Sequence, residues 1–495
     1  MRWSDFPGWL KVIILLGVFS LFASALFKYP GTGLYYVWLS VVANGLLYFG
    51  FRDQAIFFDT FIGVFFWLGF WMKFSYRLVF MDGDFIDSGH FDFSPAAFDQ
   101  AVLVAVCGLS GLLLASYLRG KYIFNYPKEC IVDTLPGLFN FYVSHRKFIL
   151  FIFLAFVLVV GVANIYLGVY QRGEITRTVL PFGLNRIVAW LLLFGLASFV
   201  AVFLNFEFRL KRNSYFLVVL YSFLEGAISS ISLLSRGMVL NTGSMLYGVI
   251  YQLRIGGMKV RAAVAVFVLV VFAALFFGSA VGVTYARTYS YTVNLEKVDA
   301  VAQPRAEKIV SSPGEGPKDV KVEHTTPTMA QHVVALFLDR WVGMDGVMAV
   351  SSYPGLGWEL WTKAWAEAYN ENVLSFYDSN IINSAYNNEQ SANFHFVSLS
   401  GIVAFFFYPG SYCFLFFAMF SLGVGAALVE IFVYKFGGRN VVLCSLFGQI
   451  VAYRFMSFGY VPAQSYLLFG SIMLNVLLIY YVDMILSFGR ARLAS

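Results

Sequence analysis

Arginines that interrupt apolar sequence are the residues of this chain best suited to chemistry. Ser235-Arg236-Gly237 separates two apolar segments with no room for a loop, and Arg454 lies between Tyr453 and Phe455. A charge at membrane depth is costly, so it indicates a buried polar environment or an anionic ligand. The planar guanidinium suits phosphate and other oxyanions. We therefore predict an oxyanion site, for which an ion pair or lipid headgroup contact is the alternative at each position. Its candidate members are Arg77, Arg172, Arg177, Arg236, Arg287, Arg340 and Arg454.

His395 is the candidate general base. It lies in Asn393-Phe394-His395-Phe396, where a long polar stretch returns to apolar sequence. Imidazole titrates near neutral pH, which suits it to accept a proton from a hydroxyl group. A histidine at a membrane interface can also serve only as a hydrogen-bonding group. Its expected position, at the same membrane level as the arginines, favours the catalytic interpretation.

Two acidic features have simpler interpretations. Asp82-Gly83-Asp84 with Asp87 and His90 has the look of a metal-binding motif, but acidic loops are usually only solvated. Glu225, within apolar sequence, could relay protons in a transporter, although a hydrogen bond between helices is the simpler role. The sequence contains no P-loop, dinucleotide-binding fingerprint, nucleophile elbow or HExxH motif. We therefore expect no metal, no cofactor and no nucleic-acid partner.

The composition is that of a membrane protein. Hydrophobic residues make up 59% and charged residues 13% of the 495 positions, a balance that soluble domains do not need. An apolar run of about 17–25 residues can cross a bilayer as a helix, which satisfies its own backbone polar groups. We predict an all-α polytopic protein with about twelve such runs. They are residues 9–27, 34–50, 55–74, 101–118, 148–169, 187–205, 215–234, 237–253, 262–283, 411–436, 440–459 and 463–486.

Basic residues predict the orientation of these runs. Lys and Arg cluster in every second connection, at 52, 119–147, 209–212, 254–261, 435–439 and 490–492. Short basic loops stay on the cytoplasmic side. Both termini should therefore be cytoplasmic, and the long segment 284–410 should lie outside, which in a bacterium means the periplasmic side of the inner membrane.

The chain should divide into three parts. Residues 1–283 form an N-terminal bundle of about nine helices, 284–410 a large outer loop and 411–495 about three more helices. Residues 296–328 are rich in Pro, Gly, Glu, Lys and Ser, which indicates a flexible insertion.

Apolar residues at helical spacing then predict two amphipathic helices that lie flat at the membrane surface. The second carries Trp358, Trp361, Trp365 and Tyr369. These rings could anchor at the interface, pack on the bundle or stack on sugars.

Three short motifs indicate a family. Tyr170-Gln171-Arg172-Gly173 precedes Leu180-Pro181-Phe182-Gly183-Leu184 in an outer loop, Ser235-Arg236-Gly237 lies at a span boundary, and Asn393-Phe394-His395 precedes a late apolar stretch. With the predicted architecture, they resemble the Wzy-type oligosaccharide repeat-unit polymerases and the related O-antigen ligases. Phe396 follows His395, whereas the ligases often have Asn there.

The resemblance implies a metal-independent glycosyltransferase that acts on undecaprenyl-diphosphate-linked oligosaccharides at the periplasmic face. Arginines, with Arg236 in the matching motif, would hold the diphosphate, and His395 would activate the acceptor hydroxyl. We include Arg340 among the catalytic residues and Tyr170 among the substrate-binding residues. Membrane lipids and a chain-length regulator are the further expected partners.

Three other functions stay open as alternatives. An O-antigen ligase would transfer the glycan to lipid A core. A lipid-linked glycan flippase would share the many spans and a cationic cavity, but transporters usually show repeat-related halves, and none is seen in this sequence. A polyprenyl-phosphate-sugar transferase usually has an acidic loop after its first span, where this chain has only Lys28-Tyr29-Pro30-Gly31.

Overall fold

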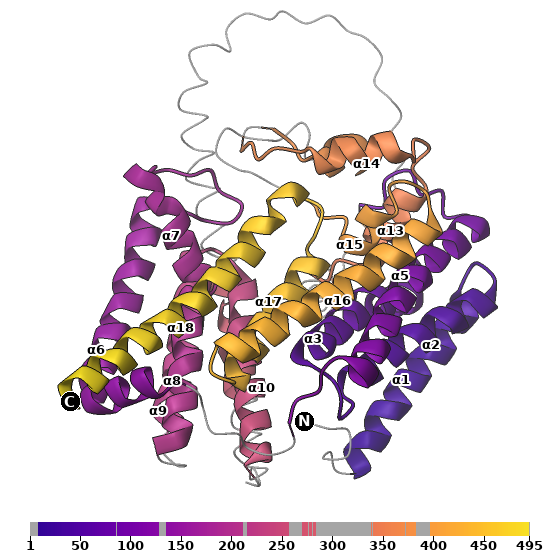
Figure 1. Cartoon of the computed structure of the whole chain (residues 1–495). Coiled ribbons are helices and arrows are strands. Elements are labelled where there is room, and N and C mark those ends of the chain that lie inside the picture. The colour runs from indigo at the N-terminus through magenta and orange to yellow at the C-terminus, as the bar shows by residue number, and fades with distance from the viewer. Residues whose placement is uncertain are drawn as a thin grey trace, which may run out of the picture.

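The computed structural model is helical, as predicted. It describes residues 8–85, 87–127, 135–210, 215–256, 270–275, 277–279, 281–283, 338, 340–371, 373–382 and 397–494. All the regular elements within these ranges are helices, and no strand occurs among them. In Figure 1, α1 (Gly8–Lys28) begins and α18 (Ser465–Ala494) ends towards the lower side of the molecule.

The helices confirm a multi-pass membrane protein. Eight are long and apolar enough to cross a membrane: Gly8–Lys28, Gly33–Gly50, Phe57–Phe80, Pro95–Tyr122, Pro136–Leu167, Pro181–Leu210, Tyr412–Phe436 and Pro462–Phe488. Shorter apolar helices lie at Leu217–Ser232 and Val441–Met456 and in the described residues between Val270 and Val283. The remaining predicted run, 237–253, forms the short helices η5 (Arg236–Met238) and α10 (Val239–Ile255).

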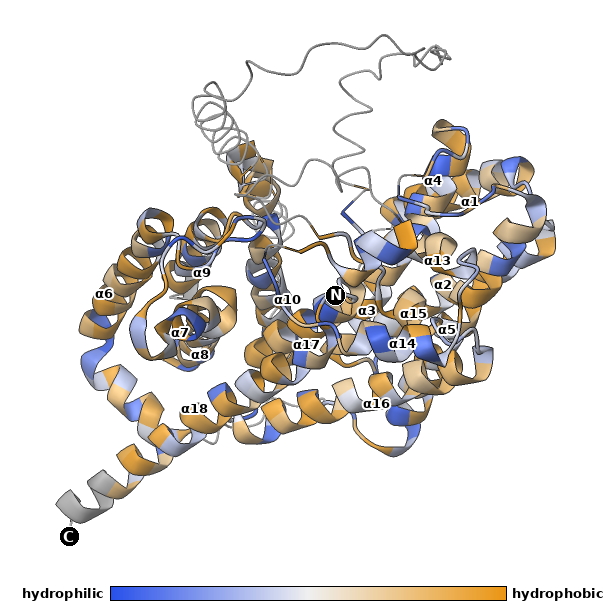
Figure 2. Cartoon of the chain, turned by 90° about the horizontal axis from the view of Figure 1, so that it is seen from above, coloured by the Kyte–Doolittle hydropathy of each residue, from blue (hydrophilic) through white to orange (hydrophobic). Residues whose placement is uncertain are grey.

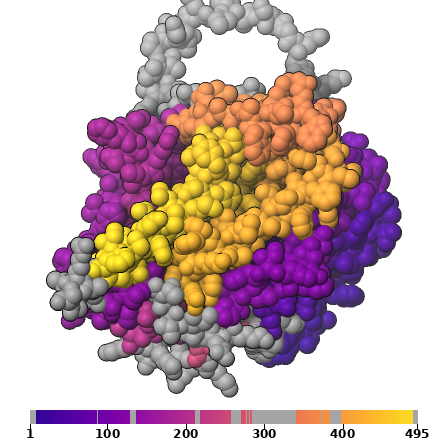
Figure 3. Space-filling view, in the orientation of Figure 1, coloured from indigo at the N-terminus to yellow at the C-terminus, as the bar shows by residue number. Residues whose placement is uncertain are grey.

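The helices form two groups that meet at α17 (Val441–Met456). Figure 2 shows α2 (Gly33–Gly50), α3 (Phe57–Phe66) and α5 (Pro95–Tyr122) in one group, and α6 (Pro136–Leu167), α8 (Leu196–Leu210) and α9 (Tyr215–Ser232) in the other. Helix α17 packs against α3, α8, α10 and α16 (Tyr412–Phe436), and most of its residues are buried. In the space-filling view, α16 and α18 cover one face (Figure 3).

The third predicted span is one helix with a π-helical segment in its centre. Helix α3 continues through η2 (Trp67–Met72) into α4 (Lys73–Phe80). Gly69 lies at this segment, and a Cβ there would come within 2.5 Å of the carbonyl oxygen of Val342. Gly69 is therefore required for the close approach of the 342–343 backbone, and this contact lies at the π-helical segment. A second π-helical segment, η4 (Leu191–Gly195), lies between α7 (Leu184–Trp190) and α8.

One predicted surface helix is instead buried. The part of the first amphipathic helix that the structure describes is α13 (Met344–Ser351), and Met344 and the run 346–351 are buried. Asp345 forms an ion pair with Lys73, whose side chain is also buried. Gly346 lets α13 pack onto the backbone of Ser400, just before α15 (Ile402–Phe406). The surface interpretation was wrong because every residue of α13 except Asp345 and Ser351 is apolar or glycine, which is the pattern of a helix buried on all sides.

The second of these helices is amphipathic, as predicted. Helix α14 (Trp358–Trp365) buries Leu360 and Ala364, whereas Glu359 and Lys363 are exposed and form an ion pair one turn apart. It lies across the upper end of the bundle, above α15 and beside the start of α18 (Figure 1).

Candidate functional site

Two of the predicted arginines meet at the upper end of the two groups. The guanidinium groups of Arg172 and Arg454 are close enough to interact electrostatically, and Tyr170 also interacts with Arg454. Arg454 donates to the carbonyl oxygen of Tyr460 (3.4 Å) and to Ser465 Oγ (3.2 Å), and it lies 5.4 Å from the ring of Phe458. These partners are neutral. Like charges held together in this way attract an oxyanion.

Buried polar contacts fix the loop that carries Tyr170 and Arg172. The Nδ2 group of the buried Asn164 donates to the carbonyl oxygens of Tyr170 (3.0 Å) and Ser232 (2.9 Å). Its Oδ1 atom accepts from the backbone N–H of Tyr170 (2.9 Å). The backbone N–H of Arg172 donates to the carbonyl oxygen of Leu233, and its Nη1 group donates to Ser235 Oγ (3.2 Å). The loop is thus held against the end of α9.

Arg236 lies in the turn that Arg172 contacts. The side chains of both Arg172 and Arg236 are half-buried. A Cβ on Gly237 would come within 3.0 Å of the Tyr453 hydroxyl, so this turn packs directly against the end of α17 that bears Arg454. Arg172, Arg236 and Arg454 thus come from three separate segments that contact one another. We call these residues, with Tyr170 and Ser235, the arginine cluster.

A row of aromatic rings joins Arg340 to the arginine cluster. Trp341 stacks on Phe65 with ring centres 5.6 Å apart, and Phe65 contacts Tyr453 edge-on at 6.1 Å. Tyr453 in turn lies against Gly237. Arg340 is half-buried and adjoins Trp341 in the chain, so its backbone lies beside this row of rings.

Strained backbone borders the arginine cluster on two sides. Leu234 has φ of 49° and Val461 has φ of 44°, a region that side chains with a Cβ rarely occupy. Leu234 immediately precedes Ser235-Arg236, and Val461 immediately follows Tyr460, whose carbonyl oxygen binds Arg454. Such strain concentrates at functional sites, where the surrounding structure holds it in place.

Two carboxylates at the edge of the cluster were not predicted. Glu371 accepts from the backbone N–H of Thr176 (3.0 Å), from Thr176 Oγ1 (2.8 Å) and from the Tyr369 hydroxyl (2.7 Å). Glu367 accepts from the backbone N–H groups of Phe376 (2.6 Å) and Val461 (3.0 Å). Burial raises the pKa of Glu367 above its usual value. Single glutamates in a polar loop carry no sequence pattern, so only the fold could reveal them.

The other predicted site residues are separate from the cluster or outside the described residues. Arg77 is buried in α4, where its Nη1 group donates to the carbonyl oxygen of Asp84 (2.5 Å), which gives it a structural role. Arg177 is exposed and forms an ion pair with Glu174 (2.5 Å). Arg287 and His395 lie outside the described residues.

If His395 is not the base, Asp339, Asp378 and Glu389 are the next candidates from the sequence. Asp339 and Glu389 also lie outside the described residues. Asp378 is buried and accepts from Ser375 Oγ (2.5 Å) and from the backbone N–H of Ser398 (3.0 Å). It thus links the start of η6 (Asp378–Ile382) to the backbone of Ser398, just before α15.

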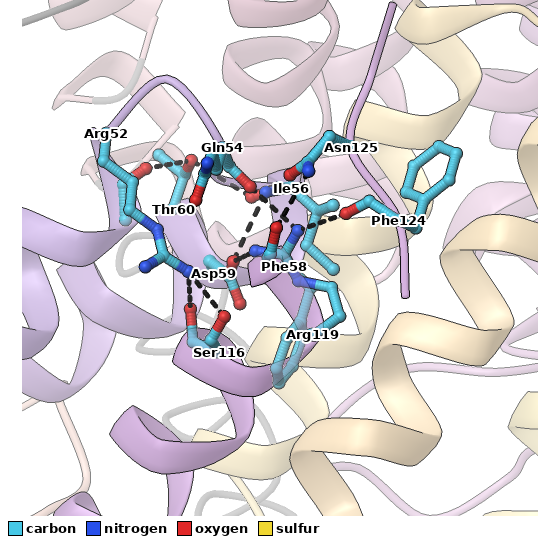
Figure 4. A network of polar contacts seen from close by, with 12 residues as sticks. Arg52, Gln54, Ile56, Phe58, Asp59, Thr60, Ser116, Arg119, Phe124 and Asn125 are labelled. Carbon is cyan, nitrogen blue, oxygen red and sulfur yellow. Dashed lines mark hydrogen bonds and ion pairs between the residues drawn. The ribbon is translucent and has the colours of Figure 1, made fainter. Parts of the chain in front are cut away.

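The opposite end of the bundle holds its arginines in a different way (Figure 4). Arg119, buried in α5, forms an ion pair with Asp59. Its Nη1 group donates to the carbonyl oxygens of Gln54 and Phe124, both at 2.8 Å. Arg52 donates to the carbonyl oxygen of Ser116 (2.5 Å) in the same network.

Nearby, Glu430 on α16 accepts from the backbone N–H groups of Phe57 and Phe58 at the start of α3, both at 2.8 Å. The carboxylate also accepts from the Tyr126 hydroxyl at 2.6 Å. A negative charge at a helix N-terminus satisfies unpaired N–H groups and the helix dipole. This end of the bundle is therefore a compensated structural network.

The two acidic features have structural contacts. Asp82 is exposed and pairs with Lys28 at 3.2 Å, and within the described ranges no three His, Cys, Asp or Glu side chains converge as a candidate metal site. Glu225 is buried in α9 and accepts from Ser229 Oγ (2.8 Å), one turn along the same helix. The expected hydrogen bond is thus within a helix rather than between helices.

No protein-family model, curated protein or solved structure matches this chain.

Proposed function

We propose that this protein is a membrane glycosyltransferase that polymerises undecaprenyl-diphosphate-linked oligosaccharide repeat units. The pair formed by Arg172 and Arg454 is the observation that carries the proposal. The two guanidinium groups lie within electrostatic range of each other, and the groups that Arg454 contacts by hydrogen bond or ring stacking are neutral. A diphosphate offers the negative charge and the paired oxygens that two guanidinium groups bind best.

The reaction needs few groups because diphosphate is a good leaving group. The bond between C1 of the donor sugar and the diphosphate oxygen breaks, and a new bond forms between C1 and the acceptor hydroxyl oxygen. Arg172, Arg236 and Arg454 stabilise the charge that develops on the departing polyprenyl diphosphate. In the proposal, Arg340 supports the donor from the side of α3, and His395 takes the hydroxyl proton.

The proposed location follows from the distribution of basic residues. With about twelve spans and both termini in the cytoplasm, the arginine cluster and the loop 284–410 face the periplasm across a bacterial inner membrane. An impermeant maleimide should then label a cysteine introduced at Ser312 in intact spheroplasts. Protection of that cysteine, with labelling after the cells are opened, would reverse the proposed orientation.

Reconstitution separates the candidate functions. Purified protein in liposomes should convert a lipid-linked repeat unit into a ladder of longer lipid-linked products without a metal or nucleotide. Products that appear only when lipid A core is added would identify the ligase instead. Movement of the lipid-linked repeat across the bilayer with no new glycosidic bond would identify a flippase and overturn the proposal.

The same assay tests the base. His395→Ala should lower turnover by about 10²–10⁴-fold while donor binding is retained, as expected when a general base is removed. Near-normal turnover of this variant would exclude His395 as the base and direct attention to Asp339, Asp378 and Glu389.

A further inference from the structure

A row of aromatic side chains leads from α14 to the arginine cluster. Trp361 and Trp365 stack with ring centres 5.4 Å apart, and Trp365 contacts Phe405 at 5.8 Å. Phe405 contacts Phe458 at 5.1 Å, and Phe458 lies 5.4 Å from the guanidinium group of Arg454. The exposed part of Trp365 is therefore separated from Arg454 by only two buried rings.

Two further aromatic residues, Tyr369 and Tyr460, also lie near Arg454. Tyr369 packs against Tyr460 with ring centres 5.9 Å apart, and the carbonyl oxygen of Tyr460 accepts a hydrogen bond from Arg454. Trp365 and Tyr369 remain 37% and 49% exposed, respectively. We call Trp365, Tyr369 and Tyr460 the aromatic shelf.

The rings of the shelf are held in place before any ligand arrives. Trp365 is fixed between Trp361 and Phe405, and the hydroxyl of Tyr369 is held by Glu371 at 2.7 Å. Glu371 also binds Thr176, in the loop that carries Arg172, so it links the shelf to the arginine cluster. A surface that is rigid when empty loses little conformational entropy on binding.

The electrostatics of the shelf favour a neutral ligand. Burial raises the pKa of Tyr460 to about 12, and burial together with Glu371 raises the pKa of Tyr369 further, so both phenols stay protonated. The Glu371 carboxylate accepts a hydrogen bond from the Tyr369 hydroxyl, and this negative charge beside the ring disfavours an anionic headgroup there. A neutral ring with apolar C–H faces, as in a pyranose, is the chemistry that packs on exposed aromatic rings.

We infer that the aromatic shelf binds the sugars of the substrate that lie next to the diphosphate. The inference rests on the proposed function for the identity of the glycan. In this arrangement, the arginine cluster holds the charged linkage and the shelf holds the neutral sugars beside it. Trp365 and Tyr369 are specificity-determining residues, and Glu371 is a positioning residue that orients Tyr369.

The test uses a glycan that has neither lipid nor diphosphate. Oligosaccharide fragments from partial hydrolysis of the source cell's surface polysaccharides are titrated onto the full-length protein in nanodiscs, and binding is followed by saturation-transfer NMR. Trp365→Leu and Tyr369→Leu should each weaken binding by about threefold to tenfold. Glu371→Gln should weaken glycan binding less than these two variants do. If the hydrogen bond between Glu371 and Tyr369 serves to orient the ring, Tyr369→Phe should weaken glycan binding by the same factor as Glu371→Gln.

Trp358→Leu is the matched control. Trp358 lies on the same helix and is 55% exposed; it contacts Phe414 on α16 and Trp361 but none of the three shelf residues, so its variant should bind the fragments as the wild type does. No binding by the wild type, or equal binding by all variants, would overturn the inference. Stronger quenching of the wild type than of Trp365→Phe by lipids with brominated acyl chains would assign the surface to the bilayer instead.

A second binding measurement distinguishes failure of this inference from failure of the proposed function. Undecaprenyl diphosphate without sugar should bind the wild type and the Trp365 and Tyr369 variants equally. Glycan binding without diphosphate binding would overturn the role of the arginine cluster and leave the shelf intact. Diphosphate binding without glycan binding would overturn the role of the aromatic shelf and leave that of the arginine cluster intact.

Discussion

Arg119 and Arg454 both occur near the end of an apolar helix, yet their surroundings differ. Arg119 is 1% exposed and is neutralised by Asp59 within a network in which its Nη1 group also donates to two carbonyl oxygens (Figure 4). Arg454 is half-buried and is accompanied by a second guanidinium group and neutral partners. The first arrangement stabilises the fold, whereas we propose that the second binds an anion.

The comparison gives a criterion for arginines in membrane proteins. Position near a span end does not by itself identify a ligand site, because Arg77 and Arg119 are as deep as any candidate and serve the fold. What differs between Arg119 and Arg454 is the kind of partner: Arg119 pairs with a carboxylate, whereas the hydrogen-bond partners of Arg454 are a carbonyl oxygen and a hydroxyl group. This difference supports our proposal that the upper end of the bundle binds the substrate; Leu234 and Val461, both with positive φ, lie beside it.

Removing the counter-charge of Arg119 should have the largest effect. Asp59→Asn leaves a buried guanidinium group without its ion pair, so the free energy of unfolding should fall by about 3–5 kcal/mol. Chemical unfolding in detergent measures this change, with the exposed Asp82→Asn as the control. A stability equal to that of the wild type would mean that the two ends of the bundle do not differ as described.

Arg454→Gln should affect activity rather than stability. Removing one donor that stabilises transition-state charge lowers turnover by about 10²–10³-fold. Stability should change little, because only neutral contacts are lost and repulsion with Arg172 is relieved. Turnover of the lipid-linked repeat and the unfolding midpoint are measured on the same preparation. Arg186→Gln, an exposed arginine on α7, is the control and should behave as the wild type.

Arg236→Lys should have an intermediate effect. Lysine keeps the charge but cannot form the two parallel hydrogen bonds of the guanidinium group. Donor affinity should fall about tenfold, which corresponds to about 1.4 kcal/mol. The affinity of Arg236→Gln for the donor should be lower still. If the Lys and Gln variants bind donor as the wild type does, Arg236 does not contact the diphosphate.

Ser235→Ala should have the smallest effect. It removes the hydroxyl that accepts a hydrogen bond from Arg172 Nη1, and such a bond contributes about 0.5–1.5 kcal/mol. Donor affinity should therefore fall only a few-fold, measured in the same binding assay. A loss as large as that of Arg454→Gln would show that Ser235 itself binds the substrate.

The sequence predicts the helices better than it predicts which of them pack against one another. Apolar runs locate the long helices, and the spacing of Trp358, Trp361 and Trp365 predicts α14 correctly. Arg172 and Arg454 could each be identified as oxyanion-binding residues from their type and position. Their approach to each other depends on long-range packing of α9, α10 and α17, which no local pattern encodes.

The burial of helix α13 corresponds to two signals in the sequence, a charge within an apolar run and a set of glycines. Lys73, in the third apolar run, needs a counter-charge at membrane depth, and Asp345 is its partner. Gly69, Gly343 and Gly346 are the small residues that allow the backbones to approach. Glycines and one buried charge pair, read together, indicate a segment that inserts into the bundle rather than one that lies on its surface.

Binding of undecaprenyl diphosphate without any sugar tests the central claim most directly. The wild type, Arg454→Gln, Arg186→Gln and Trp365→Leu are compared in nanodiscs with the same labelled lipid. The arginine cluster predicts tight binding by the wild type, Arg186→Gln and Trp365→Leu, and binding at least about tenfold weaker by Arg454→Gln, because a charge-assisted hydrogen-bonding group is lost. Equal affinity of all four proteins, each confirmed as folded, would contradict the assignment of this cluster to the diphosphate.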